Sequence, residues 1–284
     1  MLGIALTLSA CQPGVLDPAG PVGAAQRTIL IDSVMIMLAI VGPTILAIVA
    51  CAWWFRAGNP KAQRLPNFAY SGQIELVTWG IPTLTVILLG GVAWIGSHQL
   101  DPARPLDSKV APLDVQVVSL DWKWLFIYPN QHVASVNELW IPAGVPVKFS
   151  LTSASVMNTF FVPQLGSMIY TMNGMADTLH LMADEPGTFL GLSGHYSGDG
   201  FSDMHFKVQA VTPEKFAAWV SATRGTGPVL DSPAYIELSK QTVPPAPWTY
   251  RDVEAGLFDR VVSLALPPGP GPRVAGAMGK TDVR

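Results

Sequence analysis

The chain has 284 residues, of which 49% are hydrophobic and only 13% charged, whereas soluble globular chains average about 25% charged residues. Its formal net charge of −3 argues against a nucleic-acid-binding protein, because neutralising phosphates needs a basic surface. Residues 1–96 hold 4 basic and 3 acidic side chains, and residues 97–284 hold 13 and 17. With a mean hydropathy of +0.34, this predicts a membrane segment followed by a water-exposed domain.

The N-terminus has the pattern of a bacterial lipoprotein signal. An apolar run leads to Leu8, Ser9 and Ala10, two of them small, and then to Cys11. We expect residues 1–10 to be a signal peptide, Cys11 to be the lipidated residue and residues 11–27 to be an exported tail. A signal peptide normally opens with basic residues, and none precedes Cys11, so the alternatives are a translation start further upstream or a cysteine present by chance.

Residues 28–98 predict a transmembrane hairpin. Residues 33–55 and 76–98 are two uncharged runs of 23 residues, each long enough as a helix to cross a hydrocarbon core of about 30 Å. Pro43 and Pro82 lie within these runs, where a kink frees a carbonyl that needs a neighbouring partner, so we expect a partner helix beside the hairpin.

The basic residues orient this hairpin. The loop between the two runs contains Arg56, Lys61 and Arg64, whereas the preceding tail has only Arg27. Basic loops stay in the cytoplasm, so both ends of the chain are expected on the outer, periplasmic side.

Residues 110–211 alternate between apolar and polar side chains and contain turn residues at short intervals, which predicts a β-sandwich or small barrel. From Asp114 onward, Trp122, Trp124, Phe126 and Tyr128 are expected on one face of a strand. The further strands are expected at 138–141, 145–153, 158–162, 178–181, 187–191 and 204–211.

The C-terminal part predicts helices and irregular chain. Residues 212–264 form the expected helical extension, which starts with Thr212 as cap and Pro213 in the first turn. Residues 228–250 are Pro-rich and predicted irregular, residues 253–264 predict a short helix, and residues 265–284 predict a disordered tail.

Four motifs carry a resemblance to a known family. Taken with the lipoprotein signal, the hairpin and the exported β-domain, they resemble subunit II of the bacterial haem-copper ubiquinol oxidases of the cytochrome bo and ba type, a copper-free relative of cytochrome c oxidase subunit II. The resemblance implies a cupredoxin-like sandwich, so the expected fold class is a membrane-anchored α plus all-β chain. The motifs are residues 119–124 (SLDWKW), 155–163 (SVMNTFFVP), 185–188 (EPGT) and 197–204 (SGDGFSDM).

In the cytochrome c oxidase branch this domain holds two coppers through cysteine, histidine and methionine ligands, and the resemblance identifies the matching positions. Only Met204 keeps a ligand side chain of the expected kind. Copper that cycles through Cu(I) prefers soft thiolates, but the only cysteines are Cys11 and Cys51, so we expect no metal in this chain. The positions with other residues are Asn158, Ser193, His195, Ser197 and Phe201.

The sequence offers two alternative sites. His180, His195 and His205 could form another metal site, but their gaps of 15 and 10 residues match no compact ligand motif. Trp122 and Trp124 could carry electrons, but without copper such a path has no acceptor, so a packing role is favoured.

Glu75 is the ionisable residue of most interest, because it directly precedes the second uncharged run, residues 76–98. One interpretation is an ordinary acid at a helix N-terminus, and the other is a proton-uptake residue, since ionisable groups at membrane depth tend to mark ion pathways. The resemblance favours the second, because it implies a glutamate at the mouth of a proton channel in subunit I.

The resemblance implies a non-catalytic subunit of a proton-pumping ubiquinol oxidase. The haems and one copper are expected in subunit I, no cofactor is expected here, and the expected partners are subunits I, III and IV, ubiquinol and the lipid bilayer. The expected location is the bacterial inner membrane. A cytochrome c oxidase subunit with an altered copper site and a lipid-anchored assembly or adaptor protein remain as alternatives.

Overall fold

The computed structural model describes residues 14–63, 66–166, 168–243 and 246–271. The chain forms two compact units. Residues 25–101 form the hairpin unit, and residues 14–24 together with the described chain from Pro102 onward form the β unit.

The hairpin unit contains α2 (Gly72–Gln99) and all of α1 (Pro21–Trp54) except its first turn, residues 21–24, which belongs to the β unit. Both helices are long and apolar enough to cross a membrane. The first begins 12 residues before the expected run at 33–55 and ends at Trp54, and the second extends beyond both ends of the run at 76–98. Each continues through its internal proline, Pro43 or Pro82. The helices approach closely at Gly96, where an added Cβ would come within 2.9 Å of the Ile29 side chain. Most large apolar side chains of this unit are exposed, as expected for helices that contact lipid or other membrane helices.

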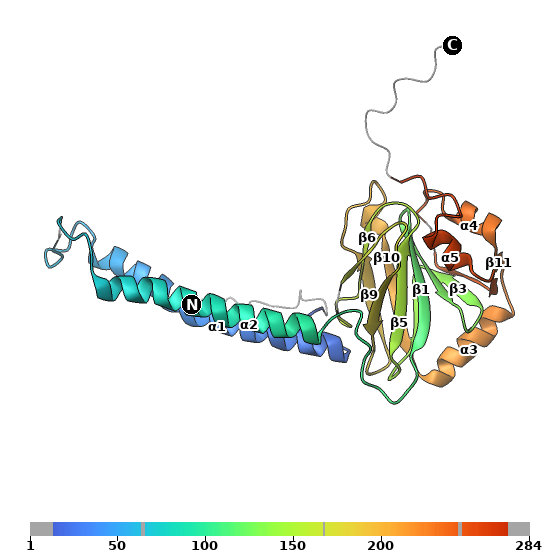
Figure 1. The fold of residues 1–284 in the computed structure, drawn as a ribbon, viewed down its shortest axis with the longest axis horizontal. Helices are drawn as coiled ribbons and strands as arrows, with labels where there is room; N and C mark the ends of the chain where they lie inside the picture. The colour runs from blue at the N-terminus through green and yellow to red at the C-terminus, as the bar shows by residue number, and fades with distance from the viewer. Residues whose placement is uncertain (1–13, 64–65, 167, 244–245, 272–284) are drawn as a thin grey trace, which may run out of the picture. The chain divides into compact units, whose positions relative to one another are not determined.

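The β unit contains two sheets that pack face to face (Figure 1). The six-stranded sheet has the order β12-β3-β2-β1-β5-β8, and the five-stranded sheet has the order β4-β10-β9-β6-β7. One parallel pair occurs in each sheet, β1 with β5 and β10 with β4, and the other pairs are antiparallel. The strands are β1 (Leu113–Leu120), β2 (Lys123–Tyr128), β3 (Val133–Val136), β4 (Glu138–Pro142), β5 (Val147–Ser153), β6 (Asn158–Phe161), β7 (Ile169–Thr171), β8 (Asp177–Leu181), β9 (Gly187–Ser193), β10 (His205–Val211) and β12 (Trp248–Tyr250).

The main core lies between the two sheets and is rich in aromatic side chains. Trp124 of β2 is fully buried and contacts Phe160 and Phe206, with ring centroids 5.6 and 5.5 Å apart. Phe206 also contacts Phe126 at 5.1 Å. Aromatic pairs at these separations stabilise a core beyond their burial alone. Trp124 therefore has the packing role that the sequence favours.

The part of the C-terminal extension from residue 229 onward covers the outer face of the six-stranded sheet, on the side away from β6, β9 and β10 (Figure 1). It forms a second core there, in which Leu125 and Ile127 of β2 lie under Tyr235 and Phe258. Every residue of β2 is therefore buried. The extension contains α3 (Pro213–Arg224), β11 (Val229–Leu230), α4 (Ser232–Leu238), β12, β13 (Asp252–Val253) and α5 (Leu257–Val262).

The helix predicted after Thr212 is confirmed as α3, and the Thr212 side chain caps it by accepting a hydrogen bond from the Lys215 backbone amide.

The prediction that residues 228–250 are irregular was wrong. Asp231 caps α4 by accepting from the Ala234 backbone, and a proline in the first turn fits the helix start. Residues 272–284 of the predicted tail lie outside the described residues.

The expected exported tail begins with Cys11 and residues 12–13, which lie outside the described residues. Residues 14–24 belong to the β unit. The Ala19 amide donates to the Gln164 carbonyl at 2.8 Å, and its carbonyl accepts from the Asp184 amide at 2.9 Å. At Gly20 an added Cβ would lie 2.0 Å from the Met182 carbonyl oxygen, so this tight contact requires glycine.

Buried Lys123 ties the extension to the sheet. Its ammonium donates to the Lys240 carbonyl at 2.6 Å and to the Thr242 hydroxyl at 2.5 Å. Burial lowers the pKa of Lys123 from 10.5 to about 8, and the charge of Asp121 partly opposes this shift.

This shift predicts a pH dependence of stability. Between pH 8 and 10.5 the unfolded chain binds more protons at Lys123 than the folded chain, so the free energy of unfolding should rise with pH, on the order of 1 kcal/mol. Urea unfolding of the full chain in detergent at several pH values measures this slope. Lys123→Met should flatten it, whereas Lys215→Met, at an exposed position of α3, should keep it. Equal slopes in both variants would contradict the assignment to Lys123.

Candidate functional site

The six positions that the resemblance matches to copper ligands gather at one end of the smaller sheet. Asn158 begins β6 and Ser193 ends β9. Residues 193–204, which we call the 193–204 loop, connect this strand end to β10 and include a short 3-10 helix, η1 (Phe201–Asp203). The Ser193 amide donates to the Met204 carbonyl at 3.2 Å and so closes the loop at its base.

Ser193 is the centre of a buried polar network. Its side chain is only 6% exposed, and its hydroxyl lies 3.3 Å from both the Asn158 amide oxygen and the His195 carbonyl oxygen. The hydroxyl also accepts from the backbone amides of His195 and Thr159, each at 3.5 Å. The Ser193 hydroxyl is thus satisfied by hydrogen bonds to the Asn158 side chain and to the neighbouring backbone.

Ser197 and Met204 form a second buried pair. The Ser197 hydroxyl donates to the Met204 sulfur at 3.6 Å, and the two residues are 3% and 2% exposed. The thioether that could serve as a soft metal ligand is therefore used as a hydrogen-bond acceptor. The structure brings Asn158, Ser193, Ser197 and Met204 together, as the resemblance implies.

The side chains of His195 and Phe201 lie at the rim. The His195 ring packs edge-on against Tyr170, with centroids 6.1 Å apart, and Phe201 packs against the exposed ring of Tyr196 at 5.7 Å. His195 contributes only its backbone groups to the Ser193 network.

We tested whether this donor set fits copper. It offers two hydroxyls, one carboxamide, one thioether and backbone carbonyls, together with a rim imidazole, and it contains no thiolate. Hard neutral oxygens do not suit copper, which favours thiolate, thioether and imidazole ligands. The residues present therefore do not fit the dinuclear centre of the cytochrome c oxidase branch.

The three scattered histidines lie on different elements of the β unit. His180 lies in β8 of the larger sheet, where its ring is near the Pro102 carbonyl, whereas His205 lies in β10 of the smaller sheet. Across the described parts of the chain, histidine, cysteine, aspartate and glutamate residues form no group of three or more suited to holding a metal ion.

Trp122 is the residue of this site that sequence reasoning misplaced. The prediction that it shares a strand face with Trp124 was wrong, because β1 ends at Leu120 and Trp122 occupies a turn with φ of +67°. Its indole N–H donates to the Ser197 carbonyl at 3.1 Å. An alternating pattern cannot reveal a left-handed tryptophan, because this conformation is rare for bulky side chains.

Glu75 lies in the first turn of α2, where its backbone amide donates to the Ser71 carbonyl at 2.9 Å. Its carboxylate accepts a hydrogen bond from the Trp79 indole, one turn further along, at 3.1 Å. Both side chains are exposed in the hairpin unit. The Glu75 carboxylate is thus accessible to a neighbouring protein. The uncharged indole N–H of Trp79 orients it.

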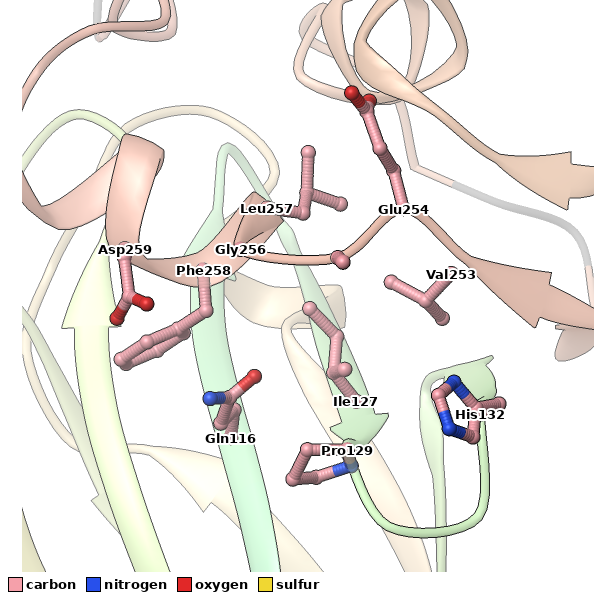
Figure 2. A pocket seen from close by; sticks show the side chains of 11 residues that line it. Gln116, Ile127, Pro129, His132, Val253, Glu254, Gly256, Leu257, Phe258 and Asp259 are labelled. Carbon is pink, nitrogen blue, oxygen red and sulfur yellow. The ribbon is translucent and has the colours of Figure 1, made fainter.

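A separate hollow of about 220 Å³ lies between β1, β2 and the loop before α5 (Figure 2). The Glu254 carboxylate points away from Ile127 and Pro129 at its base. Hydrogen bonds from Arg260 and Ser232 hold the pKa of Glu254 at about 2. The remaining polar side chains around the hollow, Gln116, His132 and Asp259, do not converge on one point (Figure 2).

Comparisons with known proteins agree with this architecture. The family model described as the periplasmic domain of cytochrome c oxidase subunit II matches residues 126–211. Ubiquinol oxidase subunit 2 of Acetobacter aceti is 46% identical over 92% of this chain and 86% of that protein. Cytochrome bo(3) ubiquinol oxidase subunit 2 of Pseudomonas aeruginosa is 44% identical over 92% of this chain and 79% of that protein.

A solved structure of the periplasmic domain of subunit II of cytochrome oxidase from Bradyrhizobium japonicum is 22% identical, with a TM-score of 0.38, over 41% of this chain and 96% of that domain. The expected fold class, two apolar helices followed by a cupredoxin-like β-sandwich and a short helical extension, is confirmed. These features fit a membrane-anchored oxidase subunit. On identity and coverage, the chain belongs to the family of ubiquinol oxidase subunit 2.

Proposed function

We propose that this chain is the copper-free subunit II of a proton-pumping ubiquinol oxidase in the bacterial inner membrane. One observation carries the proposal: the buried side chains of Asn158, Ser193 and Ser197 offer oxygen donors where copper would need thiolates and imidazoles. Ubiquinol dissolves in the membrane and can deliver electrons there directly. An electron relay through the exported domain is then unnecessary, which explains physically why the copper ligands can be absent.

In this proposal the chain supports catalysis without performing the redox step. Haems and one copper in subunit I would oxidise quinol and reduce oxygen to water, and the hairpin would pack against subunit I in an assembly that also contains subunits III and IV. The exposed apolar surfaces of α1 and α2 support this role, because such surfaces need lipid or partner helices around them. The β-domain would cover the complex on the periplasmic side.

Glu75 would contribute to proton uptake on the cytoplasmic side. It is the only carboxylate in the chain between Asp32 and Asp101, and its side chain is exposed near one end of α2. A carboxylate at the edge of a membrane segment can exchange protons with water and pass them to an adjoining protein. The Trp79 indole holds this carboxylate in a defined direction.

Lipidation of Cys11 completes the proposal. An acyl chain at Cys11 would place a second anchor on the periplasmic side, next to residues that bind the β unit from Ala19 onward. Mass spectrometry of the purified subunit would detect the acylated N-terminal peptide, and an unmodified Cys11 would remove this part of the proposal.

Copper analysis of the purified full-length subunit tests the central observation. We expect much less than one copper per chain after exposure to excess copper and desalting, because hydroxyls and one thioether bind it weakly. About two coppers per chain would favour the alternative, a cytochrome c oxidase subunit with an altered site. Met204→Leu should leave the value unchanged, which separates the loop site from adventitious copper on surface histidines.

A further inference from the structure

We propose that the C-terminal extension, residues 212–271, acts as an internal clamp that fixes the 193–204 loop through the turn formed by Asp121, Trp122 and Lys123. The extension contacts the two charged residues of this turn, and the loop contacts the tryptophan between them. This role of the extension rests on the proposed copper-free state of the loop, but not on the role of Glu75.

The first part of the clamp is the bond from Lys123 to the extension. Lys123 is 1% exposed, and its ammonium donates to the Lys240 carbonyl and the Thr242 hydroxyl just after α4. A buried ammonium is costly unless hydrogen bonds compensate, so the position of this side chain depends on the segment that supplies the acceptors.

The second part is Asp121, which is 2% exposed. One carboxylate oxygen accepts from the Ser155 hydroxyl, and the other accepts from the Gly271 amide at 2.8 Å. Two residues earlier, the Gly269 amide donates to the Ala154 carbonyl at 2.8 Å. The chain after α5 is thus bound at two points beside the turn.

The third part is Trp122, which connects the turn to the loop. Its left-handed conformation, with φ of +67°, is unfavourable for a bulky residue and needs support from the surrounding structure. This conformation aims the indole at the loop, where its N–H donates to the Ser197 carbonyl at 3.1 Å. At Gly200 an added Cβ would lie 2.3 Å from the indole ring, so the loop backbone lies directly against it.

The loop needs such support because of its composition. Residues 193–204 include Gly194, Gly198 and Gly200, which allow the chain many conformations when unfolded. Its donor set does not fit a metal that could order it, so packing and hydrogen bonds must do so. A fixed loop holds the exposed Tyr196 ring and the rim side chains of His195 and Phe201 in one arrangement, in which they can contact a neighbouring protein.

Hydrogen–deuterium exchange of the assembled complex tests this inference. Deletion of residues 267–284 removes the Gly269 and Gly271 contacts, Asp121→Asn weakens the acceptor, and Trp122→Phe removes the indole N–H together with part of the ring that packs against Gly200. We expect each change to raise deuterium uptake across residues 197–204 about five-fold, as the loss of one hydrogen bond would. Thr188→Ala, which removes an exposed bond between β9 and β10, is the matched control and should leave this uptake unchanged.

The deletion and Trp122→Phe keep the test decisive if Asp121→Asn fails to assemble. If the deletion raises uptake only near residues 154–155 and 266, while residues 197–204 exchange as in the unmodified complex, the clamp is disproved. The clamp is also disproved if Trp122→Phe leaves the deuterium uptake of residues 197–204 unchanged.

Discussion

Replacing Glu75 with glutamine should slow oxygen reduction by the assembled oxidase about ten-fold, with the haem content unchanged. A positioned carboxylate that transfers protons accelerates such steps by about 10²–10⁴-fold, and water near the end of α2 can replace part of this effect. Glutamine keeps the size and the hydrogen-bond acceptor for Trp79 but cannot carry the proton. Oxygen consumption and proton release by the complex in vesicles measure the effect.

The Trp79 indole provides an internal comparison for this prediction. Trp79→Phe keeps an aromatic ring but removes the N–H that donates to Glu75, so we expect a smaller loss, about three-fold. Trp94→Phe, near the other end of α2, is the control and should retain normal turnover. Normal turnover and pumping in both Glu75→Gln and Glu75→Ala would remove Glu75 from the proton path.

Truncation of Trp124 to alanine should destabilise the β unit by about 3–5 kcal/mol, because it leaves a large cavity in the main core. The residue is fully buried and contacts Phe160 and Phe206. Urea unfolding of the full chain in detergent, followed by circular dichroism, measures this loss.

Trp124→Phe separates packing from electron transfer. Phenylalanine retains most of the apolar contact, so we expect a milder loss of stability and normal quinol oxidation by the complex. A folded Trp124→Phe complex that no longer turns over would contradict the packing role.

Sequence reasoning predicted the parts of this fold that depend on pattern and composition. Uncharged runs and period-two alternation indicate α1, α2 and most strands, and the cap at Thr212 predicts the start of α3. These signals work because the burial pattern of a helix or strand and the hydrogen bonds of its caps depend on residues that are close in the sequence. The resemblance then brought together Asn158, Ser193, Ser197 and Met204 from segments that lie apart in the sequence.

What could not be predicted depends on contacts between distant segments. Lys123 and Asp121 alternate like residues of a solvent-exposed face, yet the C-terminal extension buries both. The short helix α4 was missed because the prolines around it predict irregular chain, although one of them lies in its first turn. Trp122 was misplaced because its conformation is supported by tertiary contacts rather than by local preference.

The electron donor of the purified complex tests the account most directly. Oxygen consumption should be fast with ubiquinol and should remain at background with reduced cytochrome c, because the donor set at Asn158, Ser193, Ser197 and Met204 does not fit a copper centre that could pass on its electrons. Rapid oxidation of cytochrome c, accompanied by copper bound to this chain, would contradict the proposed function.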